Sequence, residues 1–388
     1  MRHHFPIGAL LLALLASRVD SSHPVTMQLK RIDRSPHSHL RLRGGLSALS
    51  MPRFSASRRA AALQYGQHFF TVDVVLGDGH TLAALVDTGS GSLAVSSGSC
   101  AALGCQGHKR FRPEEDESGH FLGAAFSDMS LHFASGRISG SGFESRICMS
   151  DGSCGRTRFL VASWESSDFR SYRFDAVLGL GPPQQAIGEG FNILSAFVQQ
   201  GVLPVPAFAL SLRSQGNSTL TLGTTDAPEG TASQLQWLPT DTVHGEWALI
   251  LEDASLDGSA VGLCGGQTCR AVLDSGCPGI AVPERVARHL NAKLQLGDCS
   301  TLSQLPRLSF HVGNRSYEVG PERYVEVSKI DASKCRLLIQ ANAKDLTRTV
   351  ILGHPFLLDR YVVFDQGHMR IGLADAFPAV APEVSRRV

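Results

Sequence analysis

Two acidic residues end apolar runs in this chain, where a carboxylate is not expected. Asp87 follows "ALV" in "ALVDTGSGSLAV", residues 84–95, and Asp274 follows "AVL" in "AVLDSGCPGIAV", residues 271–282. Each is followed by a hydroxyl residue, a glycine and further apolar residues. Burying an unpaired charge is costly. A single Asp-Ser/Thr-Gly sequence is typical of a turn, but two copies inside apolar sequence favour a chemical role.

Each copy has a second apolar unit downstream. Gly179 in "FDAVLGLGPP" comes 92 residues after Asp87, and Gly353 in "TVILGHPF" comes 79 residues after Asp274. The two halves of the chain therefore repeat one organisation, an acidic turn followed by an apolar-apolar-glycine unit. This repetition makes two unrelated turns improbable.

Other hydrolytic chemistries have little support in the sequence. The 15 histidines are scattered without an H-E-x-x-H pattern, so no metal site is predicted. "DTGSGS" lacks the G-x-S-x-G arrangement of a nucleophilic serine. The sequence "GHPF" is interpreted as a loop that leads into a helix, with His354 on the surface. No cofactor is expected.

Length and charge limit the class of protein. A chain of 388 residues exceeds the usual size of a single core, which predicts two lobes. Ten of the 36 Lys and Arg, but only two of the 35 Asp and Glu, fall within residues 1–62. The rest of the chain carries 26 basic and 33 acidic residues, a net charge of −7. Such a chain is not expected to bind nucleic acid; its basic front is expected to lie on the acidic body.

The first residues indicate the secretory pathway. "MRHHFPIGALLLALLAS" has a basic start, a short apolar core and small residues at its end, as a signal peptide does. A membrane anchor is the alternative, but no second apolar segment of spanning length follows. We expect a protein without a stable membrane anchor, either secreted or held in an acidic vacuolar or lysosomal compartment.

Residues 23–62 are basic, rich in Ser and Arg, and without a clear apolar period. A disordered linker is one interpretation. The position between a signal peptide and a folded body favours the other, a removable prosegment.

Nine cysteines fit an oxidising compartment. Eight fall into pairs along the sequence and one is left over, three residues after Asp274. Disulfides are favoured over zinc because paired C-x-x-C sequences are missing. The candidate pairs are Cys100 with Cys105, Cys148 with Cys154, Cys264 with Cys269 and Cys299 with Cys335, and Cys277 is left over. Asn217 and Asn314 begin N-x-S/T sequences and are candidate glycan acceptors.

From residue 64 onward the sequence is typical of an all-β protein. Short runs such as "QHFFTVDVVLG", "AFALSLRS" and "LSFHVGNRSYEVG" alternate with Gly, Ser, Asn and Asp. Helical spacing occurs in few places, notably "FNILSAFVQQG" and "PERVARHLNAKL". A doubly wound parallel sheet is not expected, because long helices do not alternate with strands.

Across roughly residues 64–376 the sequence resembles the pepsin-like aspartic proteases. The resemblance rests on "VDTGSGSLAV", "FDAVLGLGPP", "AVLDSGCPGIAVPE", "VILGHPFLLDRYVVFD" and "RIGLADA", in the order of that family. Three of the cysteine pairs also match, those at 100/105, 264/269 and 299/335. The resemblance implies a mainly β, bilobal acid protease fold with a deep cleft between the lobes, few short helices and one aspartate from each lobe at the cleft floor.

The resemblance assigns roles to the two turns. Asp87 and Asp274 become catalytic residues that share one proton, because two carboxylates in contact do not both ionise readily. This protease class is the standard illustration of that effect. Thr88 and Ser275 are expected to tie the turns together. The remaining support residues are Gly89 and Gly276, which let the backbone pass closely, Ser90, which donates to Asp87, and Cys277.

Three positions depart from the family pattern. Phe133 stands where a hairpin flap normally carries a tyrosine, and Ala94 where a tryptophan bonds that tyrosine. Phe133 and Gly136 are the predicted flap residues near substrate, with ordinary hairpin packing as the alternative for Phe133. Cys277 replaces a hydroxyl residue that would donate to Asp274, and a thiol is a weaker donor.

The predicted organisation has five parts: a signal peptide (1–22), a basic prosegment (23–62), an N-terminal β lobe (63–216), a C-terminal β lobe (217–376) and a polar tail (377–388). The predicted function is that of a monomeric aspartic endopeptidase, made as a zymogen, that acts on polypeptides by direct attack of water. The alternative is a catalytically silent protein that binds peptides or proteins in the same cleft.

Overall fold

The computed structural model describes residues 22–33, 68–134, 136–231, 234–241, 244–296, 299–329, 331–342 and 346–375. The predicted signal peptide (except Ser22), the predicted prosegment beyond residue 33 and the polar tail lie outside these residues. The domain boundaries drawn from the sequence therefore stay predictions.

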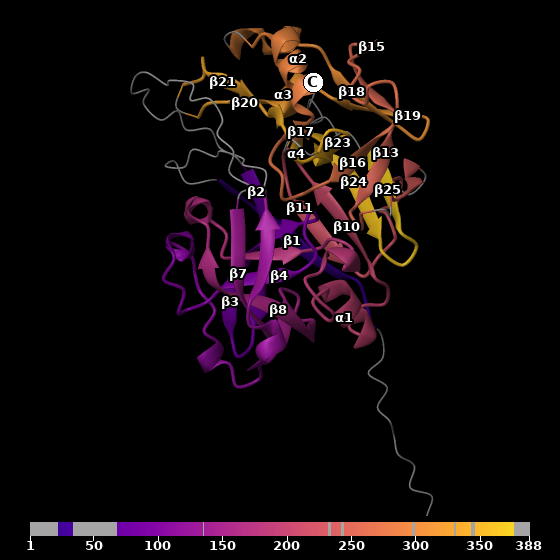
Figure 1. The fold of residues 1–388 in the computed structure, drawn as a ribbon. Helices are drawn as coiled ribbons and strands as arrows, with labels where there is room; N and C mark the ends of the chain where they lie inside the picture. The colour runs from indigo at the N-terminus through magenta and orange to yellow at the C-terminus, as the bar shows by residue number, and fades with distance from the viewer. Residues whose placement is uncertain are drawn as a thin grey trace, which may run out of the picture.

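The predicted fold class is confirmed, because the described part of the chain is mainly β with few and short helices. In Figure 1 strands β3, β4, β7 and β8 gather in one half and β16 to β19 and β23 in the other. The α-helices of the described part are α1 (Ile193–Gln199), α2 (Glu284–Leu294), α3 (Pro321–Tyr324) and α4 (His354–Leu357). The first two are those predicted from helical spacing.

Among the residues that the structure describes, the largest sheet has 14 strands in the order β12-β25-β24-β10-β11-β1-β2-β3-β9-β4-β8-β7-β5, with β6 paired to β7. Its strands are β1 (Val25–Asp33), β2 (His68–Leu76), β3 (His80–Asp87), β4 (Leu93–Ser96), β5 (His120–Phe121), β6 (Met129–Phe133), β7 (Gly136–Met149), β8 (Cys154–Glu165), β9 (Ala176–Gly179), β10 (Ala207–Leu212), β11 (Ser218–Leu222), β12 (Gln236–Pro239), β24 (Arg360–Asp365) and β25 (Arg370–Asp375).

Three smaller sheets complete the second half, in the orders β13-β16-β23-β17-β22, β15-β14-β18-β19 and β20-β21. Their strands are β13 (Ala248–Leu251), β14 (Asp253–Leu256), β15 (Ser259–Ala260), β16 (Cys269–Leu273), β17 (Ile280–Val282), β18 (Leu308–Val312), β19 (Arg315–Val319), β20 (Val325–Val327), β21 (Cys335–Leu337), β22 (Ile339–Ala341) and β23 (Thr349–Leu352).

The two halves place their acidic turns by the same pairing. In the first half, β3 runs parallel to β9 so that Asp87 lies opposite Gly179, and β4 returns antiparallel on the same β9. In the second half, β16 runs parallel to β23 with Leu273 opposite Leu352, and β17 returns antiparallel on β23. The apolar-apolar-glycine units are thus the strands around which each acidic turn is built.

Strand β1, from the predicted prosegment, is an interior strand of the largest sheet. It pairs antiparallel with β11 on one side, from Val25 opposite Leu222, and with β2 on the other, up to Asp33 opposite His68. Its inward-facing Val25, Met27 and Leu29 belong to the main apolar core. This segment is therefore folded into the body of the protein.

All nine cysteines lie among the described residues, and the four predicted disulfides are present. Cys148 and Cys154 lie opposite each other on β7 and β8 and close that hairpin. The disulfides join Cys100 to Cys105, Cys148 to Cys154, Cys264 to Cys269 and Cys299 to Cys335. Cys277 is the free cysteine.

Candidate active site

The Asp87 turn begins where β3 ends. Asp87 itself is only 5% exposed. The backbone N–H of Gly89 donates to Asp87 Oδ1 at 2.9 Å, and the hydroxyl of Ser90 donates to Oδ2 at 2.5 Å. Both oxygens of this carboxylate therefore accept a hydrogen bond from within the same turn.

The Asp274 turn has the same backbone contact but lacks the side-chain contact. Gly276 N–H donates to Asp274 Oδ1 at 2.8 Å. Cys277 occupies the position equivalent to Ser90, three residues after the aspartate, yet its thiol donates to the carbonyl of Gly279 at 3.3 Å. A weak thiol donor to Asp274 was predicted from the sequence; in the structure the thiol donates to the Gly279 carbonyl instead.

Thr88 and Ser275 join the two turns through four hydrogen bonds. Thr88 Oγ1 donates to the carbonyl of Leu273 at 2.8 Å and accepts from Ser275 N–H at 2.9 Å. Ser275 Oγ donates to the carbonyl of Val86 at 2.8 Å and accepts from Thr88 N–H at 3.0 Å. Both side chains are fully buried. This arrangement fixes two segments 187 residues apart in the sequence against each other.

The two carboxyl groups influence each other's protonation. Burial raises the pKa of Asp87, and hydrogen bonds from Ser90 and Gly89 oppose the rise. Burial and the negative charge of Asp87 together raise the pKa of Asp274 well above its usual range. A hydrogen bond between the carboxyl groups favours the ionised form of Asp87 and the protonated form of Asp274. The pair can therefore hold one proton, on Asp274.

The surroundings of Cys277 disfavour its thiolate form. Burial first, and then the negative charge of Asp274, raise the pKa of its thiol far above the usual range. The thiolate is the reactive form of cysteine. The side chain is consequently expected to act through packing and hydrogen bonding rather than covalent chemistry.

The β6–β7 hairpin carries the predicted flap residues. Phe133 lies opposite Gly136, and its ring meets that of Phe169 edge to face at 5.7 Å between centroids. Ala94, 1% exposed, belongs to the apolar cluster against which Phe133 packs. A Cβ at Gly136 would lie 2.6 Å from Ser166 Cβ. Hairpin packing is thus what the structure shows for Phe133, and contact with substrate stays a prediction.

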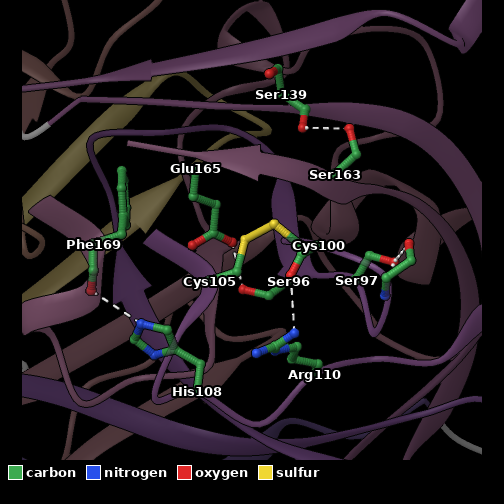
Figure 2. The surroundings of a disulfide bond; sticks show 11 residues. Ser96, Ser97, Cys100, Cys105, His108, Arg110, Ser139, Ser163, Glu165 and Phe169 are labelled. Atoms are coloured by element: carbon green, nitrogen blue, oxygen red, sulfur yellow. Dashed lines mark hydrogen bonds between the residues drawn. A yellow bond between two sulfur atoms is a disulfide. The ribbon is translucent and has the colours of Figure 1, made fainter. Parts of the chain in front are cut away.

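A buried carboxyl group behind this hairpin was not anticipated from the sequence. Glu165, 5% exposed, accepts a hydrogen bond from Ser96, and its pKa is raised by burial against the opposing effects of that bond and of His108 and Arg110. Figure 2 shows the group beside the first disulfide, with His108 contacting the carbonyl of Phe169. These contacts connect the end of β4 to the end of β8, and the segment after the first disulfide to Phe169.

His354 also differs from its sequence-based interpretation. It begins α4, as the predicted loop-to-helix junction requires, but it is 4% exposed rather than on the surface. Its Nε2 lies 2.8 Å from the carbonyl oxygen of Ser275, and its backbone N–H donates to the carbonyl of Cys277 at 2.9 Å. Its place directly after Gly353 of the second apolar unit was the signal that could have identified it.

Trp247 is a second residue beside the turns that was not predicted from the sequence. Its indole N–H donates to the carbonyl of Leu180, next to Gly179 in the first half, at 2.8 Å. Its own carbonyl accepts from Leu273 N–H, next to Asp274, at 2.8 Å. One buried residue therefore touches the neighbours of both acidic turns.

Within the described ranges no group of three or more His, Cys, Asp or Glu is placed to hold a metal ion. In that same part of the chain no helix is long and apolar enough to cross a membrane. Asn217 and Asn314 are exposed, as glycan acceptors must be, and their modification stays a prediction.

The fold and the site define a mainly β protein in which two aspartate turns, one from each half, meet through buried hydroxyl groups. The family model "Eukaryotic aspartyl protease" matches residues 69–376, and the chain belongs to this family. It is 27% identical to human gastricsin over 311 residues, which cover 75% of this chain and 77% of the relative. It is 28% identical to rat cathepsin E over 331 residues, 80% of each chain, and 32% identical to mouse napsin-A over 326 residues, 78% of this chain and 76% of the relative.

Proposed function

We propose that this protein is an aspartic endopeptidase that hydrolyses peptide bonds with Asp87 and Asp274. The observation that carries the proposal is the four-bond connection between Thr88 and Ser275, which brings the two aspartate turns together. Membership of the aspartyl protease family supports it.

The asymmetry of the pair gives each carboxyl group a role. Asp87, with donors on both oxygens, is the ionised member and takes a proton from a water molecule bound between the two groups. Asp274, with its raised pKa, is the protonated member and donates a hydrogen bond to the scissile carbonyl. The activated water then attacks the peptide carbon directly, and no covalent enzyme intermediate forms. The low dielectric of a buried site strengthens both interactions.

We further propose that the protein is made as a secretory-pathway zymogen. The burial of β1 in the largest sheet supports a segment that folds with the body. The contact of Lys30 in this strand with Asp73 in β2 agrees with a basic front on an acidic body. Acidification would weaken such pairs by protonating surface carboxylates. The expected mature N-terminus, near residues 58–66, lies outside the described residues.

One contact favours the second candidate, a protein that binds peptides without cleaving them. Because the thiol of Cys277 faces Gly279, Asp274 receives no side-chain donor from the position that supplies one to Asp87. Without that donor the ionised form of Asp274 is less stable. A reaction in which Asp274 must give up and regain a proton rapidly would therefore be slower.

Hydrolysis of acid-denatured globin at about pH 3 to 5, with and without pepstatin, distinguishes the two. The enzyme should release peptides, and pepstatin should stop the release. Asp87→Asn and Asp274→Asn should each lower the rate by about a thousandfold or more with the fold retained, because neither carboxyl group replaces the other. Binding of pepstatin without any hydrolysis would support the silent protein, and pepstatin-sensitive hydrolysis by either Asn variant would contradict the mechanism.

A further inference from the structure

Three polar groups of Ser275 are anchored, by partners from both halves of the chain. Its N–H and its hydroxyl are bound to Thr88 and Val86 of the first half. Its carbonyl oxygen accepts from the imidazole of His354 at 2.8 Å. His354 lies at the junction between β23 and α4 in the second half. Its bond therefore joins the second turn to another part of the same half.

His354 binds the second aspartate turn at two points. Its side chain contacts the residue after Asp274, while its backbone N–H donates to the carbonyl of Cys277, three residues after Asp274. The loop itself passes too close for any side chain at the preceding position, because a Cβ on Gly353 would lie 2.1 Å from the Cys277 carbonyl oxygen. His354 therefore binds both ends of the segment 275–277, at the carbonyl groups of Ser275 and Cys277.

The imidazole is itself fixed by aromatic rings of β2. Its centroid lies 5.1 Å from that of Phe70 and 6.4 Å from that of Phe69, both edge to face. The residue is 4% exposed. Since a carbonyl oxygen only accepts, Nε2 must carry a hydrogen, and it does so both in the neutral Nε2–H tautomer and in the imidazolium form.

The residue of the first half that is equivalent to His354 cannot make this contact. Leu180 follows Gly179 as His354 follows Gly353, and a leucine side chain cannot donate. The first turn instead has the hydroxyl of Ser90 on its carboxylate, where the second has a thiol directed elsewhere. The Nε2 of Gln185 also donates to the Gly89 carbonyl of the first turn, at 3.3 Å. Beyond the shared Thr88 and Ser275 bonds, the first turn thus has side-chain donors from Ser90 and Gln185, and the second has the donor from His354.

We propose that His354 is a positioning residue that orients the Asp274 turn by donating its Nε2–H to the Ser275 carbonyl, in place of the donor that Cys277 does not supply. The proposal rests on the proposed function, because it assigns His354 to the orientation of one of the two catalytic carboxyl groups. His354 does not touch the reacting atoms; it acts through Ser275.

Two substitutions separate the donor from the ring. His354→Phe keeps the edge-to-face packing on Phe69 and Phe70 but leaves the buried Ser275 carbonyl without this donor. His354→Gln loses the ring but carries an amide N–H at about the position of Nε2. A matched control is His289→Gln, since His289 is exposed on α2. kcat and KM are measured on one peptide, per mole of protein with native near-ultraviolet circular dichroism.

We expect His354→Phe to lower kcat on the order of tenfold or more and to change KM less than about twofold. The reason is that a misoriented carboxyl group affects the transition state more than substrate binding. His354→Gln should keep kcat within about threefold of the unsubstituted protein. Unchanged kcat in His354→Phe, or equal losses in both variants, would overturn the proposal and leave His354 a packing residue.

A second measurement does not depend on activity. In ¹⁵N spectra of the full protein, His354 should show a protonated Nε2 throughout the pH range. A neutral Nδ1–H tautomer would overturn the proposal, because that tautomer cannot donate to Ser275. If the unsubstituted protein hydrolyses nothing, the proposed function fails, while the tautomer still decides whether His354 holds the turn.

Discussion

Gly276 lies against Asp87, the aspartate of the opposite turn: a Cβ built on it would stand 2.5 Å from Asp87 Oδ1. Gly89 has the reciprocal relation, with its Cβ position 2.7 Å from Asp274 Cγ. Each turn therefore keeps a glycine where the carboxyl group of the other turn passes. The glycines are needed for this close approach, since any side chain would push the carboxyl groups apart.

Gly276→Ala and Gly89→Ala should each lower peptide hydrolysis by about a hundredfold or more, because displacement of a catalytic group by about 1 Å has an effect of that order. The matched control is Gly367→Ala, whose added methyl group would meet its nearest atom at 3.4 Å. Rates and pepstatin affinity are measured on folded protein. Normal hydrolysis in both glycine variants would show that the carboxyl groups do not meet as described.

Cys277→Ser should give Asp274 the donor that Ser90 gives Asp87. A hydroxyl donating to the carboxylate favours the ionised form and lowers the pKa of Asp274, which burial and the charge of Asp87 raise. The pair then loses its shared proton at a lower pH, so the alkaline limb of the pH–rate profile should move to lower pH while hydrolysis is kept or increased.

The measurement is a pH–rate profile of both proteins on one peptide substrate. Loss of activity in folded Cys277→Ser would indicate that the thiol itself takes part in the reaction. The unsubstituted protein should also react slowly with iodoacetamide near pH 8, because burial and Asp274 raise the pKa of the thiol.

Asp365 should set part of the stability at low pH. Burial alone would raise its pKa, but hydrogen bonds from Arg370 and His368 outweigh that effect and lower it. A group whose pKa is lower in the folded state stabilises the protein above its unfolded value of about 4 and loses this contribution as the pH falls through the folded value.

Asp365→Asn should therefore lower the free energy of unfolding at neutral pH by roughly 1–3 kcal/mol and flatten its decline below about pH 4. Denaturant unfolding across the acidic range tests this, with Asp128→Asn on the surface as the control. If the free energy of unfolding of the Asn variant declines as steeply as that of the unsubstituted protein, Asp365 does not contribute to the loss of stability at low pH.

Strand β1 should stay bound after the chain is cut between residues 34 and 67. It pairs with strands on both sides and buries Val25, Met27 and Leu29, contacts that do not depend on pH. After limited proteolysis at neutral pH, the fragment that contains β1 should elute with the body in size-exclusion chromatography and separate in denaturant. A free fragment under native conditions would contradict this prediction, because it would show that the strand pairing and the buried side chains of β1 do not hold it without the covalent connection.

Much of this protein could be predicted from local patterns in the sequence. The two acidic turns, their glycines and the apolar strands around them are encoded by residue types that favour turns and buried strands. Helices α1 and α2 follow from the spacing of apolar residues, and the four disulfides from cysteine pairs together with a family resemblance. All of these signals lie within short segments or in a repeated motif.

Only the tertiary structure decided the contacts between distant segments. The hydroxyl of Ser275 donates to the carbonyl of Val86, 189 residues away, and the thiol of Cys277 donates to the carbonyl of Gly279. His354 is buried, with its ring edge to face against Phe70. A histidine after Gly353 has the same local sequence whether it faces solvent or the Ser275 carbonyl. The sequence of β1 likewise does not indicate its partners, which are β11 on one side and β2 on the other. Such choices depend on which groups remain to be paired once the strands have packed, and the order of residues along the chain does not specify that pairing locally.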